Sequence, residues 1–132
     1  MAGTIMIVED EPAVARGVQI ALEREGYSTA IVGTGEEAIK QFADVAPDLI
    51  LLDVRLPGIN GIELLKLLNQ DRQVREVPVL FCSGATELLE ENHDAIEKSG
   101  AKVVTKPFTL DGLIESVHQT LAQGQRHPDG AT

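Results

Sequence analysis

The segment Leu49–Asp53 constrains the fold of this chain more than any other. Four consecutive apolar residues, LILL, precede the aspartate, without alternation between apolar and polar side chains. A strand that has water on one face alternates, whereas a strand inside a parallel sheet is buried on both faces and is apolar throughout. The segment therefore predicts a strand in the middle of a parallel sheet.

The rest of the chain alternates β-branched apolar runs with helical patterns. Further strands are predicted at Thr4–Val8, Ser28–Val32, Val77–Cys82 and Ala101–Thr105. Helices are predicted from Pro12 to Gly26, at Glu36–Ala46, Gly61–Asn69 and Thr86–Ser99, and along an apolar stripe from Leu110 to Leu121. Five repeats of strand then helix indicate an α/β fold, with a parallel sheet and helices on both of its faces.

Length and charge limit the classes of function. The 132 residues suit one domain, predicted at residues 1–122, with a disordered tail at 123–132. A formal net charge of −10 disfavours direct contact with nucleic acids and anionic membranes. No apolar run is long enough to cross a membrane, and no secretion signal is evident. The single cysteine, Cys82, cannot form an internal disulfide, so we expect a cytoplasmic location.

Polar residues stand where the predicted strands end. Glu9 and Asp10 follow the first strand, and Asp53 ends the third. Ser83 follows the fourth strand, and Lys106 follows the fifth. Because the carboxyl ends of parallel strands meet at one edge, where ligands bind in such sheets, we expect these residues to converge.

This set of residues matches the needs of phosphoryl transfer. Three carboxylates in one pocket repel each other unless a proton or cation intervenes, and Mg²⁺ prefers oxygen ligands. Asp53 can act as a carboxylate nucleophile, with Lys106 as a fixed cation and Ser83 as a hydroxyl donor. Each residue taken alone is explained as well by a helix cap or a turn. Their occurrence together at four strand ends is what favours a functional site.

The stretches IMIVEDEP, PDLILLDVRLPGINGIELL, VPVLFCSG and VTKPF resemble the receiver domain of two-component response regulators. The resemblance covers about Thr4 to Leu121. It implies a five-stranded sheet of order 2-1-3-4-5 in a flavodoxin-like, doubly wound sandwich. It also implies that Asp53 receives a phosphoryl group from a histidine kinase or a histidine phosphotransfer protein. A downstream protein partner would then respond to the altered domain.

The resemblance also implies a role for each site residue. Asp10 and Asp53 would bind Mg²⁺ directly, the backbone carbonyl of Arg55 would complete the protein ligands, and Glu9 would act through water. Ser83 would contact the phosphoryl group, and Lys106 would pair with it.

Four positions depart from the family pattern. Gly84 stands where Ala is usual, which is expected to loosen that loop. Glu9 and Ser83 stand where Asp and Thr are usual, and both substitutions keep the chemistry. Val103 stands where Tyr or Phe is usual, so the aromatic switch of the last strand is predicted to be absent or replaced.

Two other functions compete with the phosphoacceptor. A Mg²⁺-dependent phosphohydrolase of similar topology would have a second Asp two residues after the nucleophile, but Arg55 occupies that position. A phosphorylation-independent interaction module would not need Asp10, Asp53, Ser83 and Lys106. We therefore expect a protein that phosphorylates and dephosphorylates itself without turning over external substrates.

The remaining residues of chemical interest have structural explanations. Cys82 is predicted to be a buried small hydrophobe. Leu113 and Val117 are predicted to be core residues, and His93, His118 and His127 are predicted at the surface.

Overall fold

A computed structural model describes residues 3–53, 56, 58–68, 70, 77–83, 90–99, 101–105 and 109–123. The strands are β1 (Thr4–Val8), β2 (Ser28–Val32), β3 (Leu49–Leu52), β4 (Val79–Ser83) and β5 (Lys102–Thr105). The helices are α1 (Pro12–Arg24), α2 (Gly35–Val45), α3 (Gly61–Leu68), α6 (His93–Ser99) and α7 (Leu110–Ala122).

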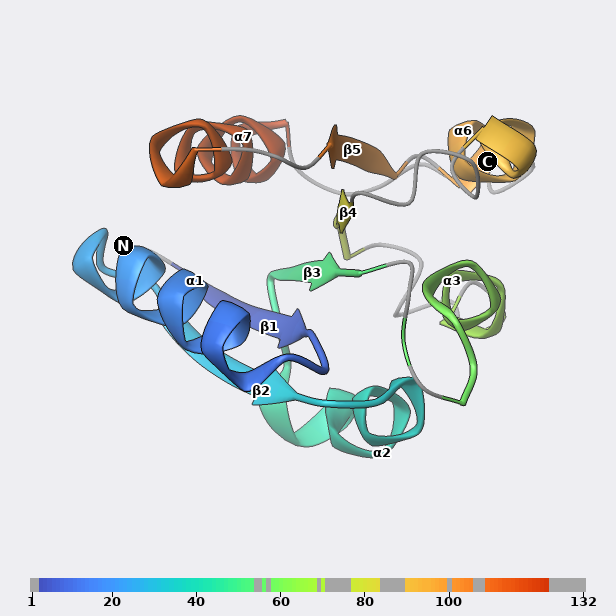
Figure 1. Cartoon of the computed structure of the whole chain (residues 1–132), viewed down its shortest axis with the longest axis horizontal. Coiled ribbons are helices and arrows are strands. Elements are labelled where there is room, and N and C mark those ends of the chain that lie inside the picture. The colour runs from blue at the N-terminus through green and yellow to red at the C-terminus, as the bar shows by residue number, and fades with distance from the viewer. Residues whose placement is uncertain are drawn as a thin grey trace.

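The strands form one parallel sheet of order β2-β1-β3-β4-β5, which confirms the predicted topology. Strand β3 is central, and Leu51 pairs with Ile7 on one side and Leu80 on the other. All four residues of β3 are buried, as their unbroken apolar sequence predicted. Helices lie on both sides of the sheet (Figure 1).

The two faces of the sheet carry separate apolar cores. Ile7, Leu51 and Leu80 belong to the core that α1 and α7 cover, where Leu113 and Val117 are fully buried. The core on the other face is covered by α2, α3 and α6, and includes Met6, Ile50, Phe81, Ile62 and Ile96. The pleat explains this division, because neighbouring residues of a strand point to opposite faces.

Side chains cap the N-termini of the helices α2, α3 and α7. The Thr34 hydroxyl accepts a hydrogen bond from the Glu37 N–H at 3.1 Å, and Thr109 accepts one from Gly112 at 2.9 Å. Asn60 Oδ1 accepts from the Glu63 N–H at 2.9 Å. Each bond satisfies a donor that a helix N-terminus leaves unpaired.

The predicted boundaries differ slightly from those of the structure. Strand β4 begins at Val79 rather than Val77, since Pro78 has no N–H to donate, although its carbonyl accepts from the Ile50 N–H at 3.0 Å. The first part of the predicted helix Thr86–Ser99, and nearly all of the tail at 123–132, lie outside the described residues. No helix in the described part is long and apolar enough to cross a membrane.

Candidate functional site

The carboxyl edge of the sheet, where β1 and β3 end, holds two buried acidic side chains. The Glu9 N–H donates to the Val32 carbonyl at 3.1 Å, and the Asp53 N–H donates to the Val8 carbonyl at 3.2 Å. These bonds extend the ladders one step beyond the strands and fix the backbone of both acids. The Glu9 and Asp53 residues are each only 7% exposed.

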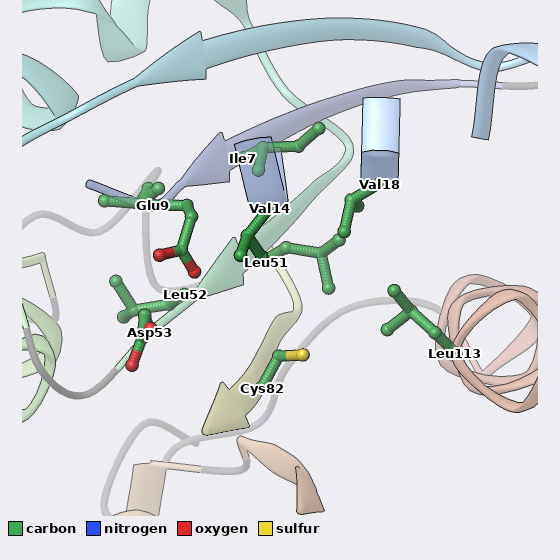
Figure 2. A pocket seen from close by; sticks show the side chains of 10 residues that line it. Ile7, Glu9, Val14, Val18, Leu51, Leu52, Asp53, Cys82 and Leu113 are labelled. Carbon is green, nitrogen blue, oxygen red and sulfur yellow. The ribbon is translucent and has the colours of Figure 1, made fainter. Parts of the chain in front are cut away.

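Asp10 completes a group of three acids, which we call the acid cluster: Glu9, Asp10 and Asp53. Each offers a carboxylate oxygen, and these oxygens all lie within 4.8 Å of one another, although Asp10 itself is exposed. In Figure 2, the Glu9 carboxylate is turned toward Asp53. Three like charges at this range raise the free energy of the site unless a cation or proton balances them. The donor set fits a hard divalent cation such as Mg²⁺.

A small apolar cavity lies beside the cluster. It measures about 20 Å³, and its lining includes Ile7, Leu51 and Leu113 together with Glu9 and Asp53 (Figure 2). Apolar walls lower the local dielectric and so strengthen electrostatic interactions in the site. Cys82 also lines the cavity but is only partly buried, so the prediction of a buried cysteine was too strong. Its thiol is turned toward Leu113 and away from Asp53 (Figure 2).

The other predicted site residues are described only in part. Ser83 is the last residue of β4 and pairs with Thr105 of β5, which places its backbone at the carboxyl edge. The side chain of Ser83, and the whole of Arg55 and Lys106, lie outside the described residues. Their roles therefore stay predictions.

The structure shows a polar contact that sequence analysis missed at the opposite, amino edge of the sheet. The Tyr27 hydroxyl is hydrogen-bonded to Nδ1 of His118, and Nε2 of His118 lies 3.4 Å from Oε1 of Glu25. His118 was predicted only as a surface residue, and its side chain is about half exposed. Burial of Tyr27, and secondarily the Glu25 charge, raise the pKa of the tyrosine hydroxyl above 10.0. This contact joins α7 to the turn between α1 and β2.

The chain belongs to the response regulator receiver domain family, whose model matches residues 5–118. The DNA-binding response regulator MtrA of Mycolicibacterium smegmatis is 32% identical over 97% of this chain. The match covers 54% of MtrA, so the chain spans about half the length of this relative.

Two solved structures show the same fold. A putative response regulator from Chloroflexus aurantiacus has 31% identity and a TM-score of 0.82, over 92% of this chain and 99% of that one. The receiver domain of a signal transduction histidine kinase from Syntrophus aciditrophicus has 32% identity and a TM-score of 0.79, over 92% of both chains. Receiver domains are signalling domains rather than metabolic enzymes, and they interact with sensor histidine kinases.

Proposed function

We propose that the carboxylate of Asp53 accepts a phosphoryl group from a phosphohistidine of a sensor kinase or histidine phosphotransfer protein. The observation that carries this proposal is the position of Asp53. It is a buried carboxylate directly after the central strand, with carboxylate oxygens of Glu9 and Asp10 within 4.8 Å of its own. A buried cluster of like charges is stabilised by binding a cation, and a bound cation supports phosphoryl transfer.

In this proposal a carboxylate oxygen of Asp53 attacks phosphorus in line with the leaving nitrogen. The P–N bond to histidine breaks, the electron pair leaves with the imidazole, and an acyl phosphate forms. Asp10, Asp53 and the Arg55 carbonyl would hold Mg²⁺, which supplies positive charge opposite the phosphoryl oxygens. Ser83 and Lys106 would contact the phosphoryl group.

The signal would then pass to a downstream protein partner in the cytoplasm. We infer that residues 1–122 form the receiver unit. The net charge of −10 argues against direct nucleic-acid binding by this unit. Val103 of β5 pairs with Phe81 of β4 and is 40% exposed. Because valine cannot reproduce the rotation of a large aromatic ring, we infer that phosphorylation is reported through other residues.

The test is phosphorylation by acetyl phosphate with Mg²⁺, followed by intact mass spectrometry. The wild type should gain the mass of one phosphoryl group, and Asp53→Asn should gain none. Asp48→Asn is a matched control, because Asp48 precedes the same strand at the amino edge and binds the Thr4 N–H at 2.8 Å. It should be phosphorylated like the wild type. A mass gain that persists in Asp53→Asn, or no gain in the wild type, would refute the proposal.

A further inference from the structure

A side chain outside α1 accepts a hydrogen bond at the start of the helix. The N-cap residue is Glu11, whose own side chain makes no capping hydrogen bond within the described part of the chain. The segment that follows, PAVA, brings no acidic residue into the first turn. The Glu11 N–H instead donates to Oε1 of Glu9 at 3.2 Å. Glu9 therefore satisfies a donor at the point where the chain turns into α1.

The same carboxylate is a member of the acid cluster. One oxygen of Glu9 lies within 4.8 Å of oxygens from Asp10 and Asp53, and the residue is 7% exposed. The hydrogen bond from Glu11 and the position of Glu9 in the acid cluster therefore both depend on the conformation of one buried side chain. Any ligand that fixes the position of the carboxylate must also affect how well it accepts the Glu11 N–H.

We propose that Glu9 is a positioning residue that couples cation binding at the acid cluster to the order of the first turn of α1. A cation would hold the carboxylate in place, and this would strengthen the bond from the Glu11 N–H. Thermodynamic coupling is reciprocal, so the bond to Glu11 should in turn raise cation affinity by orienting the carboxylate. The inference rests on the proposed function because it requires the cluster to bind a divalent cation.

Two substitutions of Glu9 separate its charge from its hydrogen bond. Glu9→Gln keeps a side-chain oxygen that can accept from the Glu11 N–H but removes the negative charge. Glu9→Ala removes both. Asp10→Asn is the matched control, since it removes the same charge from the cluster and leaves the bond between Glu9 and Glu11 in place.

The measurement is residue-resolved amide hydrogen exchange of the full chain by NMR, with and without Mg²⁺. Without metal, the Glu11 amide should exchange about fivefold to tenfold faster in Glu9→Ala than in the wild type, in line with the loss of one hydrogen bond. Glu9→Gln and Asp10→Asn should keep the wild-type protection factor of this amide, which is the exchange rate corrected for the intrinsic effect of the neighbouring side chains. Mg²⁺ should slow exchange of this amide in the wild type and should not slow it in Glu9→Gln.

Calorimetric titration with Mg²⁺ supplies the second readout. We expect Glu9→Gln to weaken Mg²⁺ binding about tenfold, as is typical when a group that supports a metal site is removed. Faster exchange of the Glu11 amide with Mg²⁺ would overturn the coupling, because the ion would then compete with the N–H for the carboxylate. An unchanged rate in Glu9→Ala would also overturn it. A wild-type chain that does not bind Mg²⁺ would instead refute the proposed metal site itself.

Discussion

The two edges of the sheet use ionisable side chains in opposite ways. At the carboxyl edge, Glu9, Asp10 and Asp53 bring three groups of the same charge together beside an apolar cavity. At the amino edge, Tyr27 and Glu25 lie on either side of His118. Nδ1 of His118 is hydrogen-bonded to the Tyr27 hydroxyl, and Nε2 can donate to the Glu25 carboxylate. The first arrangement places like charges close together and offers oxygen ligands to a cation, whereas the second pairs its polar groups with one another within the chain.

Strand β3 shows the same contrast within a few residues. Asp48, just before the strand, accepts a hydrogen bond from the Thr4 N–H at 2.8 Å. Asp53, just after it, lies among other carboxylates. An aspartate at a strand end therefore indicates a functional site when the residues brought beside it carry like charge.

The largest effect is expected where the amino edge is broken. His118→Ala should lower the free energy of unfolding by about 1–3 kcal/mol, because the hydroxyl of the buried Tyr27 then loses its partner. Tyr27→Phe removes both the hydroxyl and its need for a partner, and should cost only about 0.5–1.5 kcal/mol. Urea denaturation measures both values.

His93→Ala is the control for this comparison. His93 lies on α6, its side chain is largely exposed, and its ring nitrogens lie 3.7 Å from Asp94 Oδ1 and 3.5 Å from Glu97 Oε1. Its removal should change stability by less than about 0.5 kcal/mol. Equal losses in His118→Ala and His93→Ala would show that the contact at the amino edge does not stabilise the fold.

The next effect has the opposite sign. Asp53→Asn removes one of the clustered charges and its repulsion with the other two, so in metal-free buffer it should raise the free energy of unfolding by about 1 kcal/mol. Mg²⁺ at ten times its dissociation constant should stabilise the wild type by about 1.4 kcal/mol, and the Asn variant less. Asp48→Asn should not be stabilising in either buffer. Destabilisation by Asp53→Asn in the absence of Mg²⁺ would contradict the view that like charges oppose folding at this edge.

Most of the fold could be predicted because its signals are local. The apolar run Leu49–Leu52 indicated a central strand, and the alternation of strands with helices indicated parallel pairing. Errors occurred at element ends, where one hydrogen bond decides the boundary. Strand β4 starts after Pro78 because proline has no N–H, while the preceding Val77 matches the apolar strand pattern equally well.

The site was predicted less evenly, for a physical reason. Parallel topology places the carboxyl ends of the strands at one edge, and the strand order implied by the family resemblance makes β1 and β3 neighbours, so the approach of Glu9, Asp10 and Asp53 could be predicted. The contact between Tyr27 and His118 joins residues 91 positions apart, and no motif marks it. The bond from Glu11 to Glu9 depends on the side-chain conformation of Glu9, which sequence spacing does not determine.

The smallest effect concerns the titration of Tyr27, the only tyrosine in the chain. Burial, and then the charge of Glu25, raise its pKa in the folded state above the ordinary value of 10.0. The unfolded chain therefore loses this proton at lower pH than the folded one, so stability falls as pH rises from about 10 through the folded pKa. Tyrosinate absorbance should report a midpoint above 10.0 in the folded protein. The unfolding free energy of the wild type minus that of Tyr27→Phe cancels the contributions of the lysines and the cysteine, which titrate in the same pH range. This difference should decline only above about pH 10. A difference that stays constant across that range would mean that Tyr27 ionises equally easily in both states, and that the amino edge does not shield its hydroxyl from water.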